Sequence, residues 1–168
     1  MKGIASILFA VVLLGCQEPE TVSEFTGNEM SYELISGSEY DVSGTISFKE
    51  RTDGFSTVVI ALNGTDGDAK HPVHVHLGTI STDQAAVAAL LSPVLASTGK
   101  SETIFTKLAD DTPIMYKDIT NLEACIKVHL SDEGAGRDVI LAGGNIGASY
   151  VKGLSGGRMA GIAVCKSN

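Results

Sequence analysis

Regular alternation of apolar and polar residues over positions 41–49 constrains the fold more than any other feature of the chain. The apolar positions, together with one glycine, are Val42, Gly44, Ile46 and Phe48. Because successive side chains of a β-strand point to opposite faces, this period of two predicts a strand with one buried face. The turn sequence at 51–54 and the β-branched segment at 55–64 predict that the strand continues into a hairpin.

Further short segments of the same character predict an all-β domain. Strands are expected at 72–78, 101–108, 122–130, 137–145 and 157–165. One helix is expected over 84–91, because Ser81 and Gln84 have capping-box spacing, helix formers follow, and Pro93 ends the run. Short strands separated by Gly, Asn and Asp turns favour an antiparallel Greek-key sandwich or barrel with this one inserted helix.

The first 16 residues have the pattern of an export signal. Lys2 is followed by an apolar run at 4–14, which is too short to cross a bilayer as a helix. The run ends at Gly15-Cys16 and resembles the lipobox of bacterial lipoproteins, which implies cleavage before Cys16 and lipid attachment to it. An ordinary secretory signal followed by a chance cysteine is the alternative. We therefore expect a signal peptide at 1–15, a lipidated cysteine and tether at 16–38, and one β-sandwich domain at 39–168.

Charge limits the partners of the mature chain. Loss of Lys2 leaves 11 basic residues against 20 acidic ones, and there is no basic run. This balance argues against nucleic acid and anionic lipid surfaces as partners. Membrane attachment is then expected through the lipid on Cys16, in the bacterial cell envelope. Gln17 after the cysteine resembles the sorting signal for the outer membrane.

Two cysteines remain once Cys16 carries lipid. Cys125 and Cys165 form an even pair in an oxidising compartment, which predicts a disulfide between them. Two free, buried thiols are the alternative.

The histidines gather in a pattern that predicts a metal site. The chain has 4 histidines, and His71, His74 and His76 stand within six positions of one another, with His129 in a later strand. Strand parity places His74 and His76 on one face, opposite Val73 and Val75. His129 is likewise off the apolar stripe of its strand. Three imidazoles on neighbouring strands would suit copper, zinc, iron or nickel. Solvated histidines that bind nothing are the alternative.

The segments "GTISFKE" and "HPVHVHLG" resemble the Cu/Zn superoxide dismutase superfamily. The resemblance covers about 39–165 and implies that His74 and His76 bind copper, while His71 supports them. In "KVHLSDEGAGR", His129 matches a further copper ligand of the family. In "GGRMAG", Arg158 matches the arginine that guides the superoxide anion.

Departures from the family change the expected centre. No histidine is left for the bridging position or for zinc, so we expect copper on three histidines and no zinc site. The cysteines also stand elsewhere than in the family. The segments "HVHLG" and "VHLSDEGAGRDVILAGG" resemble the extracytoplasmic CHRD domain equally well, and the role of that domain is poorly defined.

Three functions remain open from the sequence. The first is an envelope lipoprotein that binds copper without catalysis, and the second is a copper-only superoxide dismutase that acts on superoxide. The third is a metal-free structural or partner-binding module. The absence of a fifth histidine favours the first function, because the bridging histidine carries a proton in the family's reaction.

Overall fold

The computed structural model describes residues 23–82, 85–155 and 164–165 and consists mainly of β-strands. The strands are β1 (Phe25–Ser36), β2 (Ser43–Arg51), β3 (Ser56–Asn63), β4 (Lys70–Leu77), β5 (Val87–Leu95), β6 (Lys100–Phe105), β7 (Glu123–His129), β8 (Ile140–Ile146) and β9 (Val164–Cys165). The described ranges also contain the 3-10 helices η1 (Tyr116–Asn121) and η2 (Gly134–Arg137) and the helix α1 (Gly147–Ser155). No helix within them is long and apolar enough to cross a membrane.

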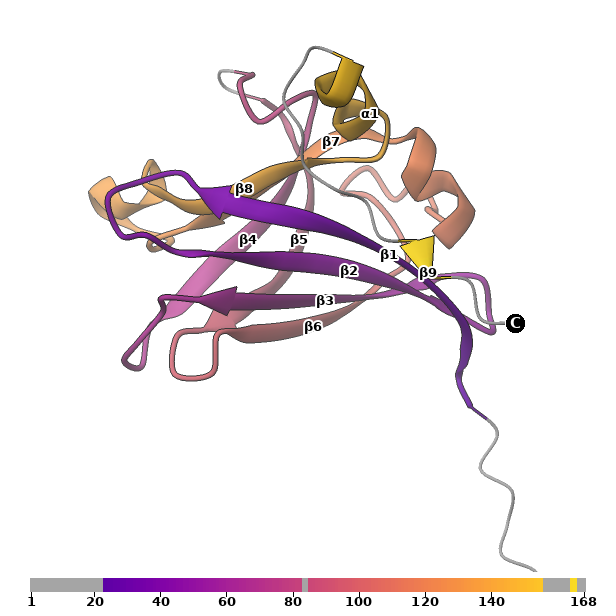
Figure 1. Cartoon of the computed structure of the whole chain (residues 1–168), viewed down its shortest axis with the longest axis horizontal. Helices are drawn as coiled ribbons and strands as arrows, with labels where there is room; N and C mark the ends of the chain where they lie inside the picture. Colours follow the sequence, from indigo (N-terminus) through magenta and orange to yellow (C-terminus); the bar gives the residue numbers. More distant parts are fainter. Residues whose placement is uncertain (1–22, 83–84, 156–163, 166–168) are drawn as a thin grey trace, which may run out of the picture.

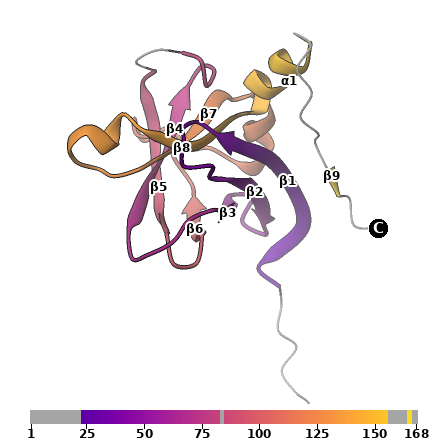
Figure 2. The same cartoon turned by 60° about the vertical axis from the view of Figure 1, so that its left-hand side comes forward.

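Strands β1 to β8 close into an antiparallel barrel, which confirms the all-β prediction. Their order is β2-β3-β6-β5-β4-β7-β8-β1, and β1 pairs back onto β2. In Figure 1, β1, β2, β3 and β6 lie in one layer, and β4 and β5 pass behind them. The closing strand β1 is long and strongly curved, as Figure 2 shows, and it reaches β8 at Ile35 and Ser36.

The inward faces of the strands form one apolar core. The alternation at 41–49 is confirmed, because Ile46 and Phe48 are fully buried while the residues between and beside them are not. Strands β4 and β7 contribute a second set of buried side chains: Val73, Val75, Ile126 and Val128. Burial of each such side chain contributes about 1.5–3 kcal/mol. These inward side chains fix the orientation of both strands, so the alternate residues of β4 and β7 face outward.

The predicted helix over 84–91 is wrong, because this part of the chain enters β5. Ala89 pairs with β4 opposite Val75, and both Ala89 and Leu91 are buried. Core burial and strand pairing therefore outweigh the helix preference of Ala and Leu. Pro93 is tolerated where the β4–β5 register shifts, and the described pairing of β5 with β6 is confined to Leu95. The helix α1 lies elsewhere, after β8.

The domain begins earlier than predicted. Residues 25–36 belong to the predicted tether at 16–38, yet they form β1, and Tyr32 and Leu34 are buried in the core. Because β1 closes the barrel against β2 and β8, a domain boundary at 39 is wrong. The predicted signal peptide at 1–15, Cys16 and Arg158 lie outside the described residues.

The predicted disulfide between Cys125 and Cys165 is not formed in the structure. Cys125 is a free, buried cysteine on β7. Its strand partners are His76 and Asn145, whereas Cys165 stands opposite Glu29 on β1. Strand β8 lies between β7 and β1, so the two cysteines belong to strands that are not neighbours. The side chain of Cys165 lies outside the described part of the chain.

Candidate metal centre

Three histidines meet on the outer face of β4 and β7. The two strands pair directly, and His74 stands opposite Lys127. His129 lies two residues beyond Lys127 and projects from the same face. Ring centroids are 4.8 Å apart for His74 and His129, 5.7 Å for His74 and His76, and 6.1 Å for His76 and His129. One ring nitrogen of each histidine lies within 4.8 Å of the others, so the three can hold a single ion.

Backbone carbonyl groups orient two of the three rings. The Nδ1 atom of His76 donates to the carbonyl oxygen of Ala85 at 2.8 Å, and that of His129 donates to the carbonyl oxygen of Arg137 at 2.6 Å. A carbonyl oxygen only accepts, so the proton of each neutral ring resides on Nδ1. The Nε2 atoms are then left with free lone pairs, the arrangement found in metal-binding histidines.

These two Nε2 atoms have no hydrogen-bond partner among the described residues. Both are buried from solvent, although His76 is 8% exposed as a residue and His129 is half-buried. An unsatisfied buried acceptor costs roughly 1–3 kcal/mol. A metal ion bound to the Nε2 atoms would remove that cost, so the residues present fit a metal.

Burial and neighbouring charges keep the three imidazoles neutral. Burial lowers the pKa of His74 from 6.5 to about 4, with further lowering by His129, His76 and Arg137. Burial also lowers the pKa of His76. The hydrogen bond to the Ala85 carbonyl raises this pKa, and the positive charge of Lys127 lowers it further.

The pKa of His129 is lowered in the same way. Burial is the largest cause, and the Arg137 carbonyl and Asp138 oppose it. Neutral imidazoles are the form that binds metals, so at neutral pH all three ligands are ready to coordinate without losing a proton.

The predicted supporting residue His71 lies outside this trio. It is buried, and its Nδ1 atom donates to the carbonyl oxygen of Leu130 at 3.1 Å. The bond ties the start of β4 to the residue that follows His129. His71 therefore fixes the spacing of the two strands that carry the histidines.

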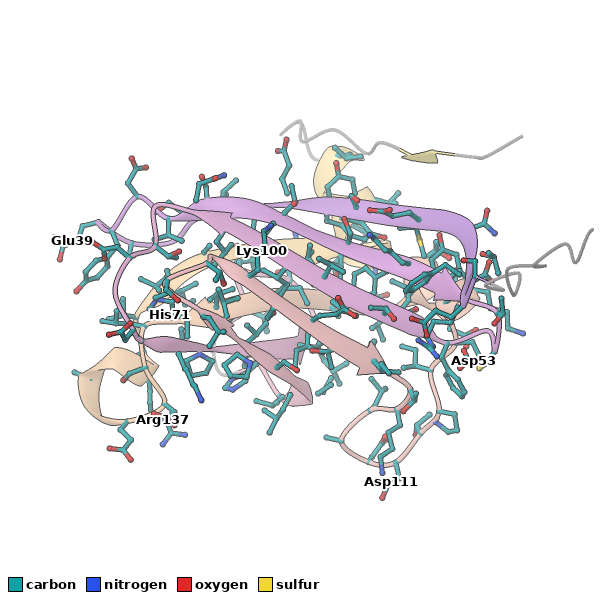
Figure 3. The ribbon with its side chains drawn as sticks, turned by 90° about the horizontal axis from the view of Figure 1, so that it is seen from below. Glu39, Asp53, His71, Lys100, Asp111 and Arg137 are labelled. Carbon is teal, nitrogen blue, oxygen red and sulfur yellow. The ribbon has the colours of Figure 1, made fainter. Side chains whose placement is uncertain are left out.

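Two cations beside the trio, Lys127 and Arg137, were given no role in the site from the sequence. Lys127 shares the parity of His129 on β7, so the alternation already placed its side chain on the same face. Arg137 belongs to η2 and lies at the same end of the barrel as His71 (Figure 3). No sequence pattern linked Arg137 to the histidines, because its place depends on how the loop after β7 folds back.

Comparison of the chain with protein-family models, curated proteins and solved structures finds no match.

Proposed function

We propose that this protein is an envelope lipoprotein whose barrel binds copper through His74, His76 and His129. The observation that carries the proposal is the pair of buried, unpartnered Nε2 atoms on His76 and His129, with His74 completing a trio within 4.8 Å. The neutral state of all three rings supports it further. When bound, copper would supply one-electron redox chemistry.

The donor set favours copper over the other metals that imidazole accepts. Ca²⁺ and Mg²⁺ prefer oxygen ligands, and the described cluster contains none. Among divalent first-row ions, nitrogen sites bind copper most tightly. A zinc site of the dismutase type needs further histidines, and His71, the remaining one, lies outside the trio.

We further propose that the barrel is a Greek key related to the superoxide dismutase and CHRD scaffolds. Strands β4, β5 and β6 follow one another in the sheet, and β7 returns to lie beside β4. This order of β7-β4-β5-β6 supports the proposal, because in a Greek key the fourth strand returns to lie beside the first. The lipid anchor on Cys16 and the outer-membrane location rest on the signal at 1–17 alone.

Superoxide dismutation is the second candidate. Lys127 and Arg137 beside the trio favour it, because their positive charges would attract a small anion to a bound metal. The sequence offers Arg158 for the same task, outside the described residues. The missing bridging histidine removes a proton donor, which makes metal binding without turnover the first choice.

Copper loading of the purified protein tests the proposal. The protein is loaded, dialysed, and analysed for metal content and for superoxide dismutation. We expect one copper per chain in the wild type and in Lys100→Gln, whose altered side chain is exposed on β6, away from the trio. His76→Gln is expected to lose the copper while keeping its circular dichroism spectrum.

Each outcome of this experiment decides one point. Bound copper without dismutation supports the first candidate, and dismutation that disappears in His76→Gln selects the second. A wild type that retains no copper overturns both and leaves the metal-free module. Copper retained equally by His76→Gln would place the metal somewhere else.

A further inference from the structure

We propose that Lys127 and Arg137 make the three-histidine centre selective for monovalent copper, Cu(I), over divalent ions. The inference rests on the proposed function, because it concerns the same site. It goes further by assigning the oxidation state that the site prefers and the residues that set the preference.

Lys127 stands closest to the trio in the strand ladder. It is the Cα partner of His74 across the β4–β7 pair, and it lies two residues before His129 on the same outward face. Its side chain is half-buried. Its charge acts on both His76 and His129. A fixed positive charge is therefore held beside all three ligands.

Arg137 places a second positive charge at the site. Its carbonyl oxygen receives the Nδ1 proton of His129 at 2.6 Å, which fixes its backbone against that ring. Its side chain is exposed, and its charge acts on His74. Asp138 is the neighbouring negative charge that acts on His129. Among the described residues whose charges act on the three rings, the cations Lys127 and Arg137 thus outnumber the anion Asp138.

The ligands themselves offset none of the charge of a bound ion. All three are neutral imidazoles, and the described cluster contains no carboxylate or thiolate. Centres that hold divalent copper or zinc commonly add an anionic ligand or water. Here the ligands neutralise none of the ion's charge, so the surrounding residues and solvent must stabilise all of it.

Elementary electrostatics then discriminates between the two copper ions. Repulsion by Lys127 and Arg137 is proportional to the charge of the ion, so a divalent ion is opposed twice as strongly as a monovalent one. The cost of removing an ion from water rises with the square of its charge, which adds to the discrimination at a partly buried site. Soft Cu(I) also accepts a small number of nitrogen ligands, whereas Cu(II) requires more ligands around it.

Measurements of affinity for both ions test the inference on the full-length protein. Cu(I) affinity is obtained anaerobically by competition with a chromophoric Cu(I) chelator, and Cu(II) affinity by competition with nitrilotriacetate. In the wild type we expect Cu(I) to bind more tightly than Cu(II). The bound copper should accordingly have a reduction potential more positive than that of the aqueous couple.

Charge-neutralising variants assign the effect to the two residues. Lys127→Gln and Arg137→Gln should each raise Cu(II) affinity relative to Cu(I) by about tenfold, as expected for loss of one nearby charge in a half-solvated site. Lys127→Arg keeps the charge and should keep the wild-type ratio. Lys100→Gln is the control, because Lys100 is exposed on β6, which β5 separates from β4.

The outcomes separate this inference from the proposed function. Failure of the wild type to bind either ion in a His76-dependent way overturns the proposed function, and this inference with it. Tighter binding of Cu(II) than Cu(I), or an unchanged ratio in Lys127→Gln and Arg137→Gln, overturns the inference alone. If Lys127→Gln fails to fold, Arg137→Gln decides, since its altered side chain is exposed.

Discussion

His74 on β4 and His129 on β7 have ring centroids 4.8 Å apart, and Lys127, two residues before His129, is the Cα partner of His74 across the two strands. The contact depends on β7 returning to lie beside β4 after β5 and β6 have been laid down on the other side. A metal centre shared by the two strands therefore links parts of the barrel that are far apart in sequence. Binding of a metal ion at this centre should therefore stabilise the whole fold.

Copper should accordingly stabilise the folded protein. An ion that binds only the native state at a free concentration 100 times its Kd adds about 2.7 kcal/mol to the free energy of unfolding. For a chain of this size that corresponds to a rise in Tm of roughly 5–10 °C. Scanning calorimetry with and without buffered copper measures the shift.

His129→Gln provides the control for this shift. The variant removes one of three ligands and should abolish most of the rise in Tm, and a chelator should reverse the rise in the wild type. A shift of equal size in the wild type and in His129→Gln would mean that copper acts elsewhere on the chain.

The metal-free protein should lose stability as the pH falls from about 6.5 to about 4. The folded pKa of His74 is lowered to about 4 from an ordinary value of 6.5, so the unfolded chain binds the proton more readily within this interval. The contribution is complete above pH 6.5 and is lost as the pH falls through the folded pKa. Because the ring is half-buried and partly screened by solvent, the loss is about 1–2 kcal/mol.

Urea unfolding at several pH values measures this loss. His74→Asn, which cannot take up the proton, should show a shallower decline between pH 6.5 and pH 4 than the wild type. Equal declines in the two proteins would contradict the neutral, buried state of His74.

The outward face of the histidines was predictable, but the disposition of the strands was not. Parity along β4 and β7 placed His74, His76 and His129 off the core, because buried Val and Ile neighbours determine which face turns inward. Local sequence was misleading at β5, because Ala and Leu favour a helix in isolation. Pairing with β4 outweighs that preference in the folded barrel. The contribution of Arg137 depends on a loop conformation that no periodicity encodes.

Strand β1 escaped prediction for a related reason. Residues 26–28, after the half-buried Phe25, are exposed, and the buried set within β1 is confined to Met30, Tyr32 and Leu34. An alternation of apolar and polar residues this short, close to a segment that resembles a signal peptide, is easily interpreted as part of a tether. Those three side chains are buried only because the barrel closes, and closure is a property of the whole sheet rather than of this segment.

Gly44 should be intolerant of any side chain. A Cβ atom at this position of β2 would lie 2.0 Å from the carbonyl oxygen of Ala61 and 2.8 Å from the Cα atom of Leu62, both backbone atoms of the paired strand β3. Relief of that clash requires movement of the strand itself. Gly44→Ala is expected to lower the free energy of unfolding by about 3 kcal/mol, the upper part of the range for overpacking.

Gly153→Ala is the matched control for this prediction. Its nearest contact would be the side-chain nitrogen of Asn145 at 3.6 Å, an ordinary van der Waals distance. Because alanine favours a helix over glycine, this change in α1 should raise the free energy of unfolding by about 0.5–1 kcal/mol. Denaturant titration of both variants gives the two signs, and destabilisation of similar size in both would refute the steric explanation.

Cys125 should be a thiol that reacts only when the barrel opens. It is fully buried on β7, and burial raises the pKa of its thiol, so both the access of reagents and the thiolate fraction are low in the native state. With iodoacetamide and no reductant, the peptide that contains Cys125 should remain unmodified in native buffer and become alkylated in denaturant. Mass spectrometry of that peptide distinguishes the free thiol from a disulfide, because a bridged Cys125 would resist alkylation in denaturant until reductant was added. Rapid alkylation in native buffer would instead contradict the burial of Cys125.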